Sequence, residues 1–270
     1  MLEKIKEAVS FIQQQYDKKP QVGIVLGSGL SSFTKEITVE KEIAYGDIPH
    51  FPISTVQGHS GKLIFGQLAG KTVVCMAGRF HYYEGYDTPA VVFPIRVMKF
   101  LGIETLLVSN AAGGVHKDWK VGDLMIIKDH ISFFTPNPLV GKNIPELGPR
   151  FPDMSEPYKK ALIDKAKGIA AAHNISLREG VYFGVTGPTF ETRAEYKLVL
   201  TLGGDAVGMS TVQEVIAAVH MGLPVFAMSV ITDIGVRDEE NTITHDEVLQ
   251  AAKDAEPKFA AIFKEMVAAV

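Results

Sequence analysis

A dense group of reactive side chains lies between Gly78 and Gly85, directly after a short apolar run. Its sequence, Arg-Phe-His-Tyr-Tyr-Glu, brings a guanidinium, an imidazole and a carboxylate together in one short segment. Arginine offers a fork of donors to a phosphate or a carboxylate, histidine exchanges protons near neutral pH, and a nearby carboxylate can orient that histidine. We therefore expect Arg79, His81 and Glu84 to form an anion site with acid–base capacity, in preference to a solvated loop with a surface histidine.

Two glycine-rich segments follow other apolar runs. Residues 27–32 read Gly-Ser-Gly-Leu-Ser-Ser and open a predicted helix, and residues 110–114 read Asn-Ala-Ala-Gly-Gly. Glycines admit a ligand close to the backbone, and amides at the start of a helix attract an anion. The first segment has Ser32 where a dinucleotide fingerprint requires glycine, and it lacks the Gly-Lys-Ser/Thr of a P-loop. Both segments are therefore interpreted either as anion-binding turns or as tightly packed structural turns.

Two further segments place polar groups after apolar runs. Residues 208–212 resemble a nucleophile elbow but carry valine in place of its second glycine, so Ser210, followed by Gln213, is interpreted as a helix cap. An anion could share the amides at that helix start. The carboxylate of Glu191 either accepts hydrogen bonds from a ligand or caps the helix that begins near Thr192.

Composition and charge argue against several classes of function. The 270 residues are 46% hydrophobic and 21% charged, which is typical of an ordered globular protein. The net charge is −4, with no basic cluster of the kind that binds nucleic acid. No apolar stretch reaches the ~20 residues of a membrane span, and charges interrupt residues 1–19, so no signal peptide is expected. The single cysteine, Cys75, and the spacing of the eight histidines predict no metal site. We expect a cytoplasmic protein.

The scaffold predicted for these residues is α/β, because β-rich apolar runs alternate with helical patterns. Strands are predicted at 22–26, 72–76, 105–108, 124–127, 181–185 and 225–231. Helices are predicted at 2–16, 89–100, 157–173, 193–200, 211–220 and 246–269, the last opening with the capping-box pair Thr244 and Glu247. Residues 133–152, with five prolines, predict a long surface loop that serves as a lid or an interface element.

Six motifs occur in the same order in one known family. They are residues 27–30, 58–61 (Gly-His-Ser-Gly), 78–85, 110–114, 187–192 (Gly-Pro-Thr-Phe-Glu-Thr) and 205–211 (Asp-Ala-Val-Gly-Met-Ser-Thr). The chain resembles the low-molecular-mass, trimeric purine nucleoside phosphorylases, a branch that also includes the methylthioadenosine phosphorylases. The resemblance runs nearly from end to end.

The resemblance implies a single domain over residues 1–270, with a mixed, twisted, partly barrel-like sheet flanked by helices. It implies a cytoplasmic homotrimer of purine salvage that needs no cofactor and no metal. The implied enzyme is a pentosyltransferase that cleaves purine ribonucleosides and deoxyribonucleosides, such as inosine and guanosine. Inorganic phosphate is the co-substrate, and the products are the free base and the sugar 1-phosphate.

Matching positions imply roles for individual residues. The phosphate would be held by Ser28, His59, Arg79, His81, Ala111 and Ser210. Glu84 would orient His81, while Tyr83 and Met209 would line the ribose and His245 would face its 5′-hydroxyl. Phe190 would pack on the base, and Glu191 and Asp233 would read its edge. The implied catalytic residues are His81, Glu84, Glu191 and Asp233.

Two positions depart from the family pattern. Asp233 replaces the usual asparagine, and an ionised carboxylate only accepts hydrogen bonds, so it suits the 6-amino group of adenosine. Glu191 suits the N1–H of inosine or guanosine, so we expect 6-oxopurine nucleosides together with adenosine. The alternative is a protonated Asp233 that imitates the amide. Leu147 matches a phenylalanine that contacts a neighbouring subunit, and it could close the neighbour's ribose pocket without aromatic stacking.

Other functions remain open from the sequence. A methylthioadenosine phosphorylase is favoured by Asp233 but opposed by Glu191 and by His245, which suits a free 5′-hydroxyl. A hydrolytic nucleosidase would not need the full phosphate site. A nucleotide-binding oxidoreductase is disfavoured by Ser32, and a non-catalytic purine-binding module is disfavoured by the intact phosphate-site residues.

Overall fold

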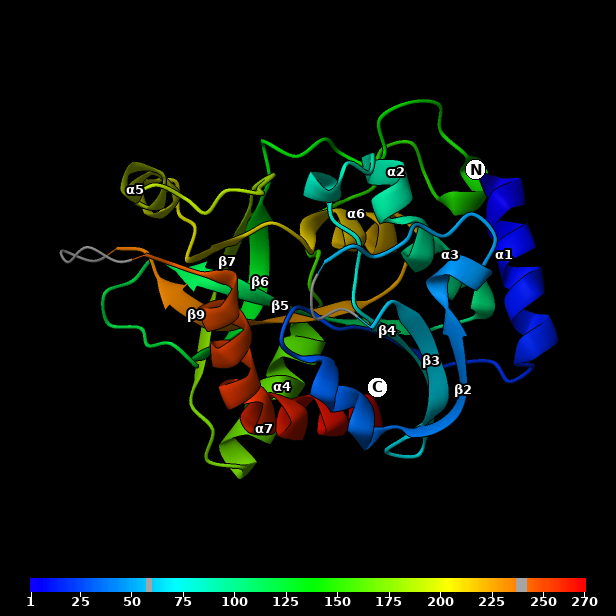
Figure 1. Cartoon of the computed structure of the whole chain (residues 1–270), viewed down its shortest axis with the longest axis horizontal. Coiled ribbons are helices and arrows are strands. Elements are labelled where there is room, and N and C mark those ends of the chain that lie inside the picture. Colours follow the sequence, from blue (N-terminus) through cyan, green and yellow to red (C-terminus); the bar gives the residue numbers. More distant parts are fainter. Residues whose placement is uncertain (57–59, 237–241) are drawn as a thin grey trace.

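One mixed sheet of nine strands organises the computed structural model within the part that it describes, residues 1–56, 60–236 and 242–270. The strands are β1 (Val22–Val25), β2 (Thr38–Ala44), β3 (Lys62–Leu68), β4 (Lys71–Ala77), β5 (Thr105–Gly114), β6 (Leu124–Ile131), β7 (Leu177–Gly184), β8 (Ala206–Gly208) and β9 (Val225–Ile234). Their order is β2-β3-β4-β1-β5-β8-β7-β6-β9, and β9 pairs with β5 as well as with β6. This additional pairing closes five strands into a ring (Figure 1). The sheet is therefore partly a barrel, as predicted.

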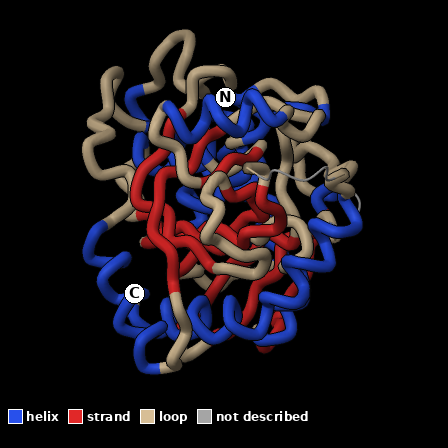
Figure 2. Tube along the Cα trace, turned by 90° about the vertical axis from the view of Figure 1, so that its left-hand side faces the viewer, coloured by secondary structure: helices blue, strands red, loops and turns tan. Residues whose placement is uncertain are grey.

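Helices cover this sheet. They are α1 (Leu2–Gln15), α2 (Thr88–Val91), α3 (Phe93–Leu101), α4 (Lys160–Ala172), α5 (Arg193–Thr201), α6 (Val212–His220) and α7 (His245–Ala269). Helix α3 packs against α1 and α6, while α7 packs against α4 and β9 on the other side of the sheet (Figure 1). Figure 2 shows the strands in the middle and the helices around them. Every residue of β1 and β9 is buried, which explains why apolar residues dominate both strands.

All six predicted strands and all six predicted helices are present, although 89–100 is divided between α2 and α3. The capping box of Thr244 and Glu247 is confirmed at the start of α7. Three strands, β2, β3 and β8, escaped prediction, and the helix expected after residues 27–32 is a short 3₁₀ helix, η1 (Ser31–Glu36). Strand β2 is largely exposed and charged, so it lacks the apolar run that marks a strand.

Two strands extend further than predicted, and both carry site residues. Residues 110–114 were expected to form a turn, but they belong to β5, and β9 continues through Asp233. The two strands are parallel, with a register shift after Ala112 that brings Gly113 opposite Asp233. Such irregularities commonly re-aim side chains next to functional sites. The sheet itself therefore positions part of the site.

The predicted long loop at 133–152 is present and contains only a 3₁₀ turn, η4 (Pro145–Leu147). Phe133 and Phe151 are 79% and 87% exposed, and Phe134 and Val140 are also exposed. Leu147, in contrast, is 1% exposed and packs in the core of its own chain. Its side chain is therefore not presented to a neighbouring subunit.

Candidate active site

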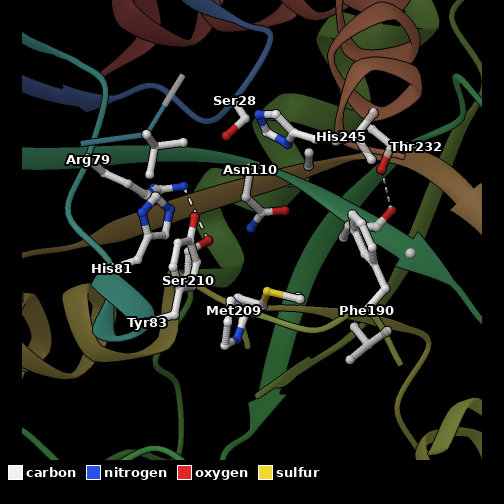
Figure 3. A pocket seen from close by; sticks show the side chains of 18 of the residues that line it. Ser28, Arg79, His81, Tyr83, Asn110, Phe190, Met209, Ser210, Thr232 and His245 are labelled. Atoms are coloured by element: carbon white, nitrogen blue, oxygen red, sulfur yellow. Dashed lines mark hydrogen bonds between the residues drawn. The ribbon is translucent and has the colours of Figure 1, made fainter. Parts of the chain in front are cut away.

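A cavity of about 480 Å³ gathers almost all of the predicted site residues, from the first loop of the chain to its last helix. The predicted residues that line it are Ser28, Arg79, His81, Tyr83, Glu84, Ala111, Phe190, Glu191, Met209, Ser210, Asp233 and His245. His59 lies outside the described residues. In Figure 3, Arg79, His81 and Tyr83 gather at one end, Phe190 and Thr232 lie at the other, and Met209 and His245 lie between them. The volume is in the range of small-molecule sites.

The basic end of the cavity is built around Arg79, which is 1% exposed. Its Nε donates to Oε1 of Glu214 at 3.1 Å, and its Nη2 lies 3.0 Å from Oε2 of the same carboxylate. Its Nη1 donates to the carbonyl oxygen of Ser109 at 2.6 Å and to Oγ of Ser210 at 3.4 Å. Because the carboxylate of Glu214 contacts the guanidinium through both of its oxygens, α6 determines where this cation points.

A second pair at this end joins His81 to Glu84. Nδ1 of His81 lies 2.9 Å from Oε1 of Glu84, and Oε2 accepts hydrogen bonds from the hydroxyl and the backbone amide of Thr55. Burial opposes ionisation of Glu84, but these hydrogen bonds outweigh it and lower its pKa to about 2. Burial lowers the pKa of His81. An ionised Glu84 can only accept, so Nδ1 carries the proton of a neutral His81.

Ser210 lies at a strained junction between β8 and α6. Its neighbour Thr211 is the N-cap of α6 and has a φ of 73°, which is rare for a β-branched residue. The amide of Asn110 donates to Oγ1 of Thr211 at 2.8 Å, and the hydroxyl of Tyr182 accepts from the backbone amide of Ser210 at 3.3 Å. The prediction that Ser210 caps the helix is therefore wrong. The hydroxyl of Ser210 instead lies beside Arg79, whose Nη1 donates to it.

The other end of the cavity is acidic. Asp233 is 6% exposed, and its Oδ2 accepts a 2.8 Å hydrogen bond from the hydroxyl of Tyr196. Burial raises the pKa of Glu191 to about 7, and the charge of Asp233 contributes to the rise. The alternative in which Glu191 caps α5 is excluded, because Thr192 and Glu195 form the capping box of that helix.

Outside the Arg79–Glu214 ion pair, three buried polar atoms of the cavity lining have no hydrogen-bond partner among the described residues. They are Oδ1 of Asn110, Oε1 of Glu191 and Nε2 of His245. Buried polar groups are almost always paired, because leaving one unpaired costs about 1–3 kcal/mol. Their convergence on one cavity indicates that a polar ligand completes them.

Comparison with known proteins agrees with this geometry. Residues 21–268 match the phosphorylase superfamily. Purine nucleoside phosphorylase 1 of Geobacillus stearothermophilus is 49% identical over 263 residues, with 97% of this chain and 96% of that protein covered. The chain belongs to the purine nucleoside phosphorylase family. The purine nucleoside phosphorylase of Bos taurus is 43% identical, with 99% and 95% covered.

Solved structures of the family share the fold. A crystal structure of Schistosoma mansoni purine nucleoside phosphorylase in complex with adenosine matches with a TM-score of 0.93. The two sequences are 41% identical, and the match covers 98% of this chain and 96% of that chain. The predicted family, fold class and enzyme class, a pentosyltransferase, are thereby confirmed.

Sequence reasoning missed several residues that build this phosphorylase site. Glu214 and Tyr196 hold Arg79 and Asp233, and Thr55 holds Glu84. The sequence does contain a signal for Glu214, since it is the one acidic residue of a mostly apolar helix. Tyr196 gives no such signal, because an aromatic residue on a helix is ordinarily a core residue.

Metal-binding clusters and membrane-spanning helices are both absent from the described ranges. Outside the gaps at 57–59 and 237–241, no cluster of three or more His, Cys, Asp or Glu side chains is arranged to hold a metal ion. Over the same ranges, no helix has the length and apolarity needed to cross a bilayer.

Proposed function

We propose that the protein transfers the ribosyl or deoxyribosyl group of a purine nucleoside to inorganic phosphate, releasing the free base and the sugar 1-phosphate. The observation that carries the proposal is the division of one cavity between a cation, Arg79, and a pair of carboxyl groups, Glu191 and Asp233. The first attracts an oxyanion, and the second suits the N–H groups of a purine. A glycosyl group passes between two nucleophiles without electron transfer, so we propose phosphate as the sole co-substrate and no cofactor.

Phosphate is assigned to the basic end, with Arg79, His81 and Ser210 around it. Ser28, Ala111 and His59 complete the proposed set, as the family resemblance implies. Because Nδ1 of His81 donates to Glu84, its Nε2 is the nitrogen without a proton, and it accepts the proton of a hydrogen phosphate. The phosphate oxygen that attacks C1′ thereby gains negative charge. Positioning phosphate and nucleoside together accounts for as much as about 7–11 kcal/mol of barrier lowering.

The sugar is assigned to the middle of the cavity. The ring of Tyr83 stacks on that of His81, with 4.6 Å between centroids, so it forms a wall beside the phosphate. Met209 supplies an apolar surface, and Nε2 of His245 supplies a buried polar atom for the 5′-hydroxyl. A methylthio group cannot satisfy that nitrogen as a hydroxyl does. This atom favours ordinary nucleosides over methylthioadenosine.

The base is assigned to the acidic end, against Phe190. With a proton on Glu191 and none on Asp233, the pair offers a donor and an acceptor, matching N1 and the amino group of adenosine. With the proton on Asp233 instead, the pair matches N1–H and O6 of inosine and guanosine. A pair that holds one proton near neutral pH thus serves both classes. We propose 6-oxopurine nucleosides and adenosine as substrates.

The first test is base release from inosine with and without inorganic phosphate. Release that requires phosphate supports phosphorolysis, whereas equal release without phosphate would identify a hydrolase. Ser210→Ala should raise the KM for phosphate about tenfold, since one hydrogen bond to a charged group is lost. The exposed Ser155→Ala serves as the matched control and should leave that KM unchanged.

The test of the base assignment is Asp233→Asn. The asparagine amide can always donate a hydrogen bond to O6, whereas the carboxyl of Asp233 can do so only when it is protonated. The adenosine-to-inosine ratio of kcat/KM should therefore fall about tenfold. An unchanged ratio would contradict the assignment of Asp233 to the base edge.

We also propose that the chain acts as a cytoplasmic homotrimer in purine salvage, folded as one domain over residues 1–270, without nucleic-acid or membrane partners. The exposed aromatic residues of the 133–152 loop support an assembly, because exposed apolar groups that gather on one segment mark interaction surfaces.

A further inference from the structure

Tyr196 links the acidic end of the cavity to the core of the protein. The residue lies on α5, is 2% exposed, and packs in a small hydrophobic cluster with Phe183 and Val199. Its hydroxyl donates a 2.8 Å hydrogen bond to Oδ2 of Asp233. The ring is held by packing, so the hydroxyl is presented to Asp233 in a fixed position.

Two glycines make room for this contact. A Cβ atom on Gly113 would lie 2.8 Å from both the hydroxyl oxygen of Tyr196 and Oδ2 of Asp233. A Cβ atom on Gly235 would lie 2.1 to 2.2 Å from ring atoms of Tyr196. Any larger residue at either position would displace the ring or the carboxylate, because packed interiors leave no slack of this size. The backbone is therefore shaped around the Tyr196–Asp233 pair.

The charges around the pair fix the direction of its hydrogen bond. Burial and the carboxylates of Asp233 and Glu191 raise the pKa of Tyr196 well above its ordinary value, so the phenol remains a donor. The hydroxyl of Thr232 donates to the other oxygen, Oδ1, at 3.2 Å. Hydrogen bonds donated to a carboxylate stabilise its ionised form. Tyr196 and Thr232 thus place a donor on each oxygen of Asp233, an arrangement that favours Asp233 as the acceptor of the pair.

We infer that Tyr196 is a positioning residue that fixes Asp233 as an acceptor at the base edge and so raises the acceptance of 6-aminopurine nucleosides relative to 6-oxopurine nucleosides. The inference rests on the proposed function, and it adds the residue that sets the balance between the two substrate classes. A 6-oxopurine needs a donor opposite O6, so the proton must move to Asp233 against the hydrogen bond from Tyr196. A 6-aminopurine needs no such transfer.

The test is Tyr196→Phe, assayed with adenosine and with inosine at saturating phosphate. The ratio of kcat/KM for adenosine to that for inosine should fall about tenfold, the worth of one hydrogen bond to a charged group. In an Asp233→Asn background, Tyr196→Phe should leave this ratio within twofold, because the carboxylate it acts on is gone. The matched control is Tyr158→Phe, which removes another buried hydroxyl, hydrogen-bonded to His130 away from the cavity.

The outcomes separate the inference from the proposed function. A wild-type enzyme that shows phosphate-dependent release, with an unchanged ratio in Tyr196→Phe, would overturn the role of Tyr196 alone. A wild-type protein without phosphate-dependent release from any purine nucleoside would overturn the proposed function. If Tyr196→Phe does not fold, Thr232→Val removes the other donor to Asp233, and the same fall in the ratio is expected. An unchanged ratio in that variant would also overturn the inference.

Discussion

The carboxylate of Glu214 contacts the guanidinium of Arg79 through both oxygens, at 3.1 and 3.0 Å, and neither side chain is more than 3% exposed. The pair joins α6 to the segment after β4, and it holds the cation that faces the proposed phosphate. Two opposite charges buried together are tolerated only while both are present. The anion site therefore depends on a residue that touches no substrate in the proposed arrangement.

Glu214→Gln should lower the free energy of unfolding by about 3–5 kcal/mol, because Arg79 is left buried without its counter-charge. Added phosphate should stabilise this variant more than the wild type, since it supplies negative charge beside Arg79. Denaturant unfolding with and without phosphate measures both effects. Asp164→Asn, which alters an exposed carboxylate on α4, is the control and should unfold like the wild type. Equal stability of Glu214→Gln and wild type would contradict the prediction.

The stability of the protein should fall in acid partly through Glu84. Its pKa of about 2 in the folded protein lies below its ordinary value of 4.5, so it binds a proton more readily when unfolded. Its contribution is therefore fully present above about pH 4.5 and is lost as the pH falls toward 2. Glu84→Gln should be less stable than the wild type at neutral pH and should lose less stability on acidification. Parallel unfolding curves for the two proteins across this pH range would argue against this role of Glu84.

The activity toward both substrate classes should depend on pH. The pKa of Glu191 is raised to about 7 by burial, and Asp233, Tyr196, Glu195 and Tyr182 are the titratable groups that interact with it. Below about pH 7 the pair of Glu191 and Asp233 holds the one proton that each proposed base arrangement needs, and above it the ionised pair offers no donor to the base. The kcat/KM for adenosine and the kcat/KM for inosine should therefore fall together as the pH rises from about 6 to about 8. Glu191→Gln should abolish this dependence, and a kcat/KM that rises over this pH range would refute it.

The 133–152 loop should carry a subunit interface. Phe151 is 87% exposed, and a serine in its place would cost nothing in an isolated chain but would weaken an apolar contact between chains. Phe151→Ser should shift the mass measured by sedimentation from a trimer toward a monomer. Leu198→Ser, at a residue 46% exposed on α5, is the matched control and should leave the mass unchanged. A wild-type protein that sediments as a monomer would contradict the trimer.

The elements and motifs that were predictable are local in the sequence. Strands β1 and β9 are dominated by apolar residues, and the Arg79–Glu84 segment concentrates its chemistry within six residues. Periodicity and residue type suffice for such features. Strand β2 was not predicted because its residues are mostly exposed and charged and form no apolar run. Its position is set by pairing with β3.

The contacts that hold the site in place were not predictable in this way. Tyr196 and Asp233 are separated by 37 residues, and Asp233 lies on β9 where its register with β5 shifts. Arg79 and Glu214 are 135 residues apart. Nothing in either local sequence specifies its partner, because the partner is selected by the topology of the sheet.

The cavity takes its lining from Ser28 near the start of the chain and from His245 and Val248 on the last helix. A chain that emerges from the ribosome N-terminus first has no complete pocket until α7 has followed β9. Binding of a nucleoside therefore cannot stabilise a partly synthesised chain, and early folding must rely on apolar packing alone. Ligand-induced protection against proteolysis should accordingly belong to the finished protein and be absent from every shorter nascent product.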